Sequence, residues 1–253
     1  MKLKEVTDYL DGYLNIGEFQ DDSANGVQVE NSTGSVEKIG LAVDACREAI
    51  LKAADAKCGL LIVHHGLFWG KQKLIVDIHY QRIRALVVAD MALYAAHLCL
   101  DGHHEVGHNV QIAKRIGLNA IEPFAEYNGR PLGMKGMLTA PKSLDEMTDD
   151  LKKAIGDFRG LLRFGPDRVR SVGIVSGSAT DTELFKELKN TDIDLFITGE
   201  PKHGAYYLAQ EYGLNIFYGG HYMTESFGMK ALGDHLKKVL GISTVFIDVP
   251  CGF

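Results

Sequence analysis

The chain has 253 residues, of which 46% are apolar and 24% are charged, and its net charge is -6 at pH 7. This length suits one large domain or two modest ones, and the apolar share is enough to bury a core. The acidic chain shows no basic stripe, which disfavours nucleic acid as a partner. No apolar run approaches the roughly 18 residues of a membrane span, so no membrane partner is expected. The four cysteines form no Cys-x-x-Cys pair, and we expect reduced thiols in a cytoplasmic protein.

Strands and helices are predicted to alternate along the chain. Continuous apolar runs are typical of strands that are covered on both faces. The predicted strands span residues 38–43, 59–63, 91–96, 170–175, 194–198 and 215–218. Helical patterns lie at residues 45–57, 80–89, 181–189, 203–212 and 221–240. This alternation indicates an α/β fold with mostly parallel sheets covered by helices.

A boundary between two halves of the chain is predicted near residue 127. A capping box at Ser143-Leu-Asp-Glu146 indicates the start of a helix that extends to about Ile155. The turn-rich stretch 129–133 precedes this helix. We therefore predict a first α/β half at residues 1–126, completed by residues 221–253, and a second half at residues 127–220.

The two halves resemble each other, which indicates an internal duplication. In each half a predicted strand is followed by a histidine, three residues and an acid. These are His97 to Asp101 in the first half and His221 to Glu225 in the second. Two related halves would bring strand C-termini to one cleft, where ligand sites of open α/β sheets lie. We expect a metal site in this cleft.

The pair His64-His65 lies at the C-terminal end of the predicted strand 59–63 and precedes Gly66. Because successive strand side chains point to opposite faces, two adjacent histidines serve two neighbouring metal ions more naturally than one. The alternative is one core histidine that binds backbone groups and one exposed histidine.

Two further motifs each have a metal-binding and a structural interpretation. His221 and Glu225 are four residues apart and share one helix face, either as ligands of one cation or as a surface pair. Asp101 is either a ligand at the end of an apolar segment or the cap of a helix beginning near His104. His104 and His108 share one helix face and are either groups that support the ligands or surface residues, and we favour the surface interpretation.

The candidate ligands are three imidazoles and two carboxylates, without a thiolate. Such a set excludes a structural zinc finger and fits two divalent ions of Zn, Fe or Mn. Two ions about 3.5–4 Å apart can activate water and bind a phosphoryl or carbonyl oxygen. The candidate ligands are His64, His65, Asp101, His221 and Glu225.

At these residues the sequence resembles the YbgI-like family, also called Nif-three-like, whose members are often labelled GTP cyclohydrolase type 2 homologues. The resemblance covers nearly the whole chain. It is carried in order by Asp22-Ser-Ala-Asn-Gly-Val-Gln-Val29, His64-His-Gly-Leu-Phe-Trp69, His97 with Asp101, Thr198-Gly-Glu-Pro-Lys-His203 and Gly220-His-Tyr-Met-Thr-Glu225. One departure is Gly66, which stands where the family usually has proline.

The resemblance implies a duplicated α/β fold, a dinuclear metal site with the five ligands above, and a homo-oligomer such as a ring-like hexamer. It does not settle the reaction, because family and fold do not fix a substrate. One hypothesis is a metal-dependent hydrolase that acts on a nucleotide or related small molecule. The alternative is a non-catalytic metal carrier, a metal-insertion factor or a nucleotide-binding regulatory protein.

Other side chains receive roles on the hydrolase hypothesis. Glu200 and His97 are interpreted as groups that transfer protons or orient ligands, although Glu200 is equally well explained as an acid at a helix N-terminus. Phe68 and Trp69 are predicted to form a wall for the substrate. Lys202 and His203 are predicted anion contacts.

Overall fold

The computed structural model describes residues 1–180 and 182–252 and divides them into two compact units. Unit 1 comprises Met1–Leu100 and Met229–Val249, and unit 2 comprises Asp101–Gly228 with the residues that follow Val249. The chain passes from one unit to the other within α4 (Leu98–Asp101), within α9 (His221–Leu240) and again after Val249. The boundary predicted near residue 127 separates two similar halves of the sequence. It is a different division from that into compact units, and it stays a prediction.

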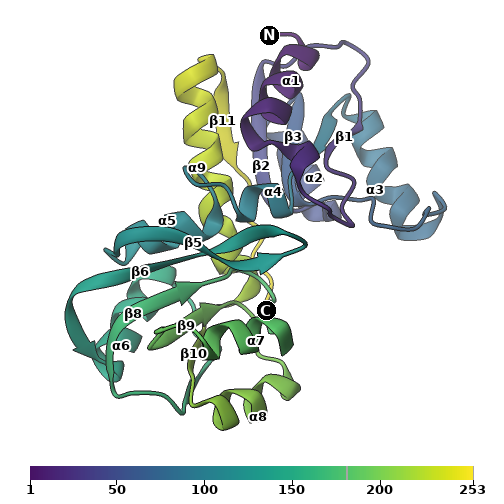
Figure 1. Ribbon diagram of the computed structural model, residues 1–253. Coiled ribbons are helices and arrows are strands. Elements are labelled where there is room, and N and C mark those ends of the chain that lie inside the picture. Colours follow the sequence, from purple (N-terminus) through teal and green to yellow (C-terminus); the bar gives the residue numbers. More distant parts are fainter. Residues whose placement is uncertain (181, 253) are drawn as a thin grey trace. The chain divides into compact units, whose positions relative to one another are not determined.

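Unit 1 contains a five-stranded sheet in the order β1-β4-β3-β2-β11 (Figure 1). The neighbours β4, β3, β2 and β11 are parallel, whereas β1 joins β4 antiparallel at the edge. The strands are β1 (Gly26–Val29), β2 (Lys38–Asp44), β3 (Leu60–His65), β4 (Ala92–Ala95) and β11 (Ser243–Phe246). The helical segments are α1 (Leu3–Leu14), η1 (Ile16–Glu18), α2 (Arg47–Asp55), α3 (Asp77–Val88) and the later turns of α9. The mostly parallel sheet predicted from the apolar runs is confirmed for this unit.

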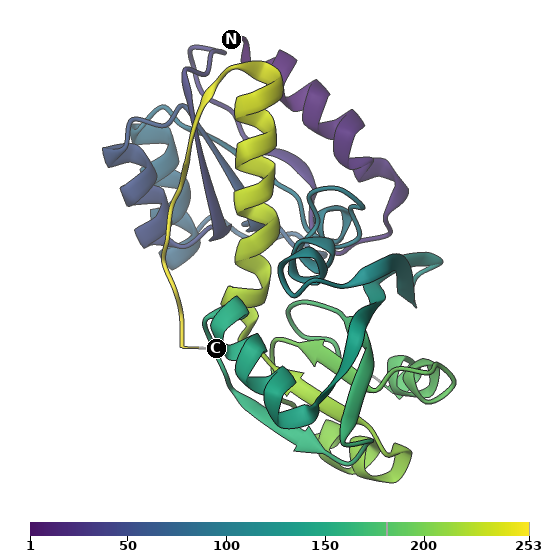
Figure 2. The ribbon, with the colours of Figure 1, turned by 90° about the vertical axis from the view of Figure 1, so that its left-hand side faces the viewer.

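Helices cover both faces of the unit 1 sheet, which explains why its central strands are apolar throughout. On one face, Leu61 and Val63 of β3 share a buried cluster with Ala53 of α2. On the other face, a Cβ at Gly233 of α9 would lie 2.9 Å from the side chain of Leu41. Figure 2 shows α2 and α3 on one side of the sheet, with α1 and α9 on the other.

Unit 2 contains a six-stranded sheet in the order β5-β6-β8-β9-β10-β7. Its centre, β8-β9-β10, is parallel, and antiparallel strands extend it at both edges. The strands are β5 (Asn119–Tyr127), β6 (Arg130–Ser143), β7 (Gly160–Arg163), β8 (Arg168–Ile174), β9 (Leu195–Thr198) and β10 (Asn215–Tyr218). The helices are α5 (His108–Arg115), α6 (Leu144–Ile155), α7 (Thr182–Lys189), α8 (His203–Tyr212) and the first turns of α9. On one face of this sheet, α5 and α6 pack in one buried apolar cluster. On the other face, α7 and α8 pack in a second buried apolar cluster.

The capping box predicted for α6 is confirmed. The Ser143 hydroxyl accepts from the backbone N–H of Glu146, and the Glu146 carboxylate accepts from the backbone N–H of Ser143. By contrast, the turn predicted over residues 129–133 is wrong beyond Gly129, because residues 130–143 form β6. The hairpin of β5 and β6 was not predicted, since its exposed and buried residues mix without a clean alternation. The predicted start of α7 at residue 181 lies outside the described residues.

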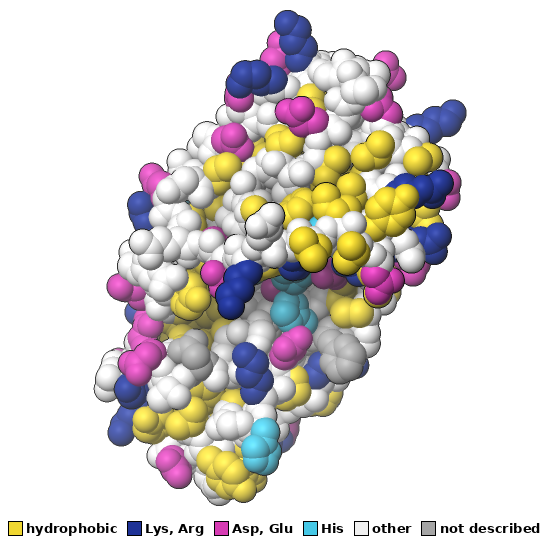
Figure 3. Space-filling model, turned by 90° about the vertical axis from the view of Figure 1, so that its right-hand side faces the viewer, with side chains coloured by type: hydrophobic (Ala, Val, Ile, Leu, Met, Phe, Trp, Pro, Cys, Tyr) yellow, Lys and Arg dark blue, Asp and Glu magenta, His cyan; other side chains and the backbone are white. Residues whose placement is uncertain are grey.

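An exposed apolar surface surrounds α3 in unit 1, and we call it the α3 surface. Figure 3 shows hydrophobic side chains gathered on the face that carries this helix. Its large exposed apolar residues are Leu74, Ile75, Val76, Ile78, Tyr80, Val87 and Val88. In the described part of the chain, no helix combines the length and apolar character that a membrane crossing requires.

Candidate metal centre

Three histidines of unit 1 lie together, and we call them the unit 1 histidine cluster. His64 and His65 end β3, and His97 follows the neighbouring parallel strand β4. Each offers one ring nitrogen, and these atoms lie within 4.8 Å of one another. The ring of His64 is 4.7 Å from that of His65 and 4.9 Å from that of His97, between centroids. The strand ends therefore bring together side chains that lie far apart in sequence.

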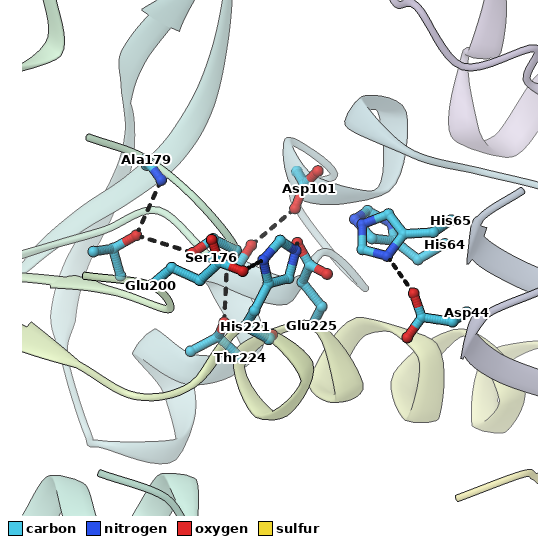
Figure 4. Close-up of polar contacts among 12 residues, drawn as sticks. Asp44, His64, His65, Asp101, Ser176, Ala179, Glu200, His221, Thr224 and Glu225 are labelled. Atoms are coloured by element: carbon cyan, nitrogen blue, oxygen red, sulfur yellow. Dashed lines mark hydrogen bonds and ion pairs between the residues drawn. The ribbon is translucent and has the colours of Figure 1, made fainter. Parts of the chain in front are cut away.

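Every histidine of this cluster has its Nδ1 atom engaged by an oxygen acceptor. His64, His65 and His97 donate in turn to Ala96 O, Asp44 Oδ1 and Asp21 Oδ1, each over 2.9 Å. Figure 4 shows the bond between His65 and Asp44. A proton held at Nδ1 leaves the lone pair of a neutral imidazole on Nε2. Metal-binding histidines are usually held in this way by a carboxylate or carbonyl.

Asp21 contacts His97 of the cluster, and its side chain is only 3% exposed. Besides His97 it accepts from the backbone N–H of Ser23 and Leu98 and from the Asn25 amide. Burial alone would raise the pKa of Asp21, but its interactions with His97 and these hydrogen bonds outweigh it. The pKa of this carboxyl therefore lies well below its usual value, and the group stays ionised.

Unit 2 contributes a different arrangement, in which His221 lies between two carboxylates (Figure 4). His221 begins α9, and Glu225 follows one turn later. The Nδ1 atom of His221 is 2.7 Å from Glu200 Oε1, and its Nε2 atom is 3.0 Å from Glu225 Oε1. Burial lowers the pKa of His221, but the hydrogen bonds and charges of Glu225 and Glu200 outweigh burial and raise this pKa to about 9. We call these three residues the unit 2 carboxylate cluster.

The loop after β8 fixes this second cluster in place. Gly177 has a φ of +65°, and a Cβ there would overlap the carboxylate of Glu225. Its N–H donates to the Thr224 hydroxyl over 3.1 Å, and its carbonyl accepts from the N–H groups of Gly199 and Glu200. Glycine is therefore required here for both its backbone conformation and its lack of a side chain.

Asp101 is a buried residue of unit 2 at the end of α4. Its Oδ1 atom accepts from the Ser176 hydroxyl over 2.8 Å, and its carbonyl accepts from the Asn109 amide. Because α5 begins only at His108, the alternative role of Asp101 as a cap near His104 is wrong. The surface interpretation of His108 is also wrong, since this ring is fully buried and its Nδ1 accepts from the N–H of Gly228.

The four residues predicted to contact the substrate lie at different places in the structure. Trp69 lies beside the unit 1 histidine cluster, with its ring centroid 4.8 Å from that of His97. Phe68 instead packs against the ring of His79. Lys202 and His203 are exposed at the start of α8. The substrate role of all four residues stays a prediction.

Gly66, the departure from the family motif, allows a close contact within unit 1. A Cβ at this position would overlap the side-chain amide of Gln28. That amide oxygen accepts from the N–H of Leu67 over 2.7 Å. The turn after the two histidines is therefore tied to the segment that carries β1.

Sequence reasoning identified Glu200, which holds His221, but missed the other residues that hold the candidate ligands. Asp44 directly follows the predicted strand 38–43, where an acid at a strand end was an available signal. Asp21 immediately precedes the motif that carries the family resemblance. Ser176 and Gly177 follow a predicted strand in a Ser-Gly-Ser sequence, which by itself indicates only a turn.

The donor chemistry of both clusters fits a divalent metal ion. Imidazoles whose Nδ1 is engaged, and buried carboxylates one helical turn from a histidine, are the ligands that Zn, Fe and Mn accept. Buried groups of histidine, aspartate and glutamate in the described residues are arranged closely enough to hold a cation.

Comparisons with known proteins identify relatives that match nearly the whole chain. The sequence pattern of Duf34/NIF3 (NGG1p interacting factor 3) matches residues 1–250. The chain belongs to the Duf34/NIF3 family. A curated relative from Archaeoglobus fulgidus, named GTP cyclohydrolase 1 type 2 homolog, is 42% identical over 250 residues, covering 99% of each chain. One from Pyrococcus abyssi with the same name is 38% identical over the full length of both chains.

Solved structures confirm the predicted fold class for this Duf34/NIF3 protein. TTHA1606 from Thermus thermophilus superimposes with a TM-score of 0.91 at 42% identity, with complete coverage of both chains. The protein ybgI, described as of unknown function, gives a TM-score of 0.92 at 30% identity, again with complete coverage. The resemblance inferred from the motifs is thereby confirmed, and two related α/β halves are compatible with the fold.

Proposed function

We propose that this protein binds a pair of divalent metal ions through His64, His65, Asp101, His221 and Glu225. We further propose that it is a metal-dependent hydrolase of a nucleotide or a related small molecule. One observation carries the proposal: the Nδ1 atoms of all three histidines in this set are engaged by an oxygen acceptor. Surface or core histidines have no need of such a uniform arrangement, whereas metal ligands do.

The number of candidate ligands supports a pair of ions rather than a single ion. Five side chains are many for a single ion and few for two, so positions remain for water or substrate. Zn, Fe or Mn ions in such a site supply Lewis acidity toward a bound oxygen and lower the pKa of water. The chain then has two tasks, which are to orient the ligands and to position the substrate.

Specific residues fit these two tasks. Glu200 holds His221 at Nδ1, and Asp44 holds His65 in the same way. Trp69 offers an aromatic ring beside the unit 1 histidine cluster. Because a purine or pterin-like ring stacks well on such a surface, the indole supports a heterocyclic substrate. The name of the curated relatives, which refers to a GTP cyclohydrolase homologue, supports the same class.

The test of hydrolysis uses metal-loaded protein with a panel of GTP, phosphoesters and cyclic amides. We expect turnover of at least one nucleotide-like compound, and loss of that turnover in Glu225→Gln. Glu211→Gln, which changes an exposed glutamate of α8, is the matched control and should keep full activity. Metal that binds and exchanges readily without any turnover would contradict the hydrolase and favour a metal carrier, an insertion factor or a nucleotide sensor.

We also propose that the protein is a homo-oligomer, such as a hexamer. The α3 surface supports this proposal, because contiguous apolar side chains exposed on a protein surface commonly mark an interaction site. Sedimentation of the wild type should give a mass several times 27.8 kDa. Val87→Asp with Val88→Asp should reduce that mass, whereas a monomeric wild type would contradict the proposal.

A further inference from the structure

We infer that Lys73, His79 and Arg82 of unit 1 form a subsite that binds a phosphate group, and we call these residues the unit 1 cationic cluster. None of the three is a proposed metal ligand. We take the nucleotide from the proposed function, on which this inference rests, and assign its phosphate to the cluster.

The helix α3 presents two of these cations on its inner face. His79 and Arg82 are three residues apart, and Ile83 and the buried Leu86 continue the same face. The side chains of His79 and Arg82 are themselves partly buried. Because an amphipathic helix usually places its charged residues on the outer face, two cations on the inner face of α3 indicate a role other than packing.

Two nitrogen atoms of this pair are buried without an acceptor. In the part of the chain that the structure describes, neither His79 Nε2 nor Arg82 Nε has a hydrogen-bond partner. A buried donor without an acceptor is costly, and such groups in native proteins are nearly always paired. Phe68 packs edge-on against the imidazole of His79, with the ring centroids 5.1 Å apart, and limits its rotation. The two side chains therefore offer fixed donors to an acceptor from outside the chain.

The positive charge of the cluster is not neutralised within the chain. Burial lowers the pKa of His79, and the charges of Lys73 and Arg82 lower this pKa further. Among residues 1–180 and 182–252, no aspartate or glutamate forms an ion pair with any of the three cations. A phosphate group supplies both the missing negative charge and several acceptor oxygens, and a guanidinium matches its geometry.

The cluster is attached to the loop that follows the two candidate histidine ligands of β3. Lys73 Nζ donates to the carbonyl of Leu67 over 3.3 Å, and Phe68 contacts His79. The next residue, Trp69, lies beside the unit 1 histidine cluster and is the residue proposed to stack on a heterocyclic ring. A nucleotide joins such a ring to a phosphate through a sugar, so it offers one group to Trp69 and another to the cationic cluster.

The experiment measures binding of inorganic phosphate to the full-length chain by calorimetry, before and after dialysis against EDTA. We expect binding in both states, because the cationic cluster needs no metal to hold an anion. Arg82→Gln should lower the phosphate affinity by about tenfold or more in both states, as the loss of a charge-assisted hydrogen bond implies. Arg84→Gln changes an exposed arginine of the same helix and is the matched control, which should bind phosphate like the wild type.

A second set of titrations distinguishes free phosphate from the phosphate of a nucleotide. GMP should compete with inorganic phosphate and bind more tightly than guanosine, and Arg82→Gln should abolish this preference. If GMP fails to displace phosphate, the assignment to a nucleotide is overturned. Phosphate binding that EDTA abolishes would place the anion on a metal ion and overturn the inference as a whole.

These outcomes are separate from the fate of the proposed function. A wild type without metal or turnover would contradict the proposed function, yet its phosphate affinity would still depend on Arg82. Turnover of a nucleotide together with equal phosphate affinity of the wild type and Arg82→Gln would overturn the inference alone. A reduced mass of Arg82→Gln in sedimentation, with unchanged phosphate affinity, would also overturn it and point to an acidic side chain of a second copy.

Lys73→Gln tests the same inference if Arg82→Gln folds poorly, as judged by circular dichroism. Lys73 is exposed, so its replacement should preserve the fold while weakening phosphate binding. Lys71→Gln changes an exposed lysine of the same loop and should have no effect. Equal phosphate affinity of the two lysine variants would overturn the inference.

Discussion

The unit 1 histidine cluster and the unit 2 carboxylate cluster occupy corresponding strand ends but offer different donors. In unit 1, β3 ends in His64-His65, and the acids Asp21 and Asp44 each accept from the Nδ1 atom of one histidine and leave its Nε2 atom to other partners. In unit 2, β9 is followed by Gly199-Glu200, and a single imidazole contacts carboxylates at both nitrogens. Unit 1 thus offers mostly nitrogen donors, and unit 2 offers mostly oxygen donors. The predictions that follow test this difference in donors from both sides.

The largest effect is expected from Gly177→Ala in unit 2. Alanine is strained at a φ of +65°, and its Cβ would displace the carboxylate of Glu225. We expect a loss of about 1–3 kcal/mol in the free energy of unfolding, together with weaker metal binding. Denaturant unfolding and metal titration measure the two effects. Gly204→Ala is the control, because a Cβ in that part of α8 meets open space; equal stability of the two variants would contradict the account.

A metal-affinity loss of roughly 10–100-fold is expected from Asp44→Asn in unit 1. Asparagine keeps an oxygen acceptor for His65 but removes the charge that makes the imidazole a stronger ligand. Isothermal titration with Zn²⁺ measures the loss. Asp8→Asn, a change on the exposed side of α1, provides the comparison and should bind like the wild type.

Glu200→Gln should change the proton affinity of the unit 2 carboxylate cluster. Removing the charge of Glu200 removes one of the two carboxylates that raise the pKa of His221 to about 9. The pKa of His221 in metal-free protein should therefore fall toward its ordinary value, as measured by NMR titration of the ring. A pKa that stays near 9 would show that Glu200 does not hold this imidazole.

The smallest effect is expected from Ser176→Ala. The variant loses the hydrogen bond to Asp101 Oδ1, and a typical hydrogen bond contributes on the order of 1 kcal/mol. Metal affinity should fall by up to about tenfold, in line with that energy. Ser178→Ala, in the exposed part of the same loop, is the matched substitution and should leave affinity unchanged.

The sequence predicted the parallel centres of both sheets because their strands are continuous apolar runs. It also predicted α6 through the capping box at Ser143. The metal-binding role of the five candidate ligands, inferred from their spacing, stays a prediction. The edge strands β1, β5, β7 and β11 and the long strand β6 were not predicted, because such strands carry mixed patterns that propensity alone does not distinguish from loops.

Asp21 and Ser176, which hold candidate site residues, could not be predicted from the sequence for a different reason. Asp21 acts on His97 across 76 residues, and Ser176 acts on Asp101 across 75. Such pairings arise from the tertiary fold, so no local pattern reveals them. The burial of His108 is of the same kind, since its partner Gly228 lies 120 residues away.

The central claim is that the chain binds a pair of divalent ions, and metal content per chain tests it most directly. Elemental analysis of protein purified without a histidine tag is compared with the same analysis of Glu225→Ala, after thermal denaturation shows that the variant is folded. The account predicts about two equivalents in the wild type and a clear loss in the variant. Metal near zero in the wild type, with no uptake of added Zn, Mn or Fe, would contradict it.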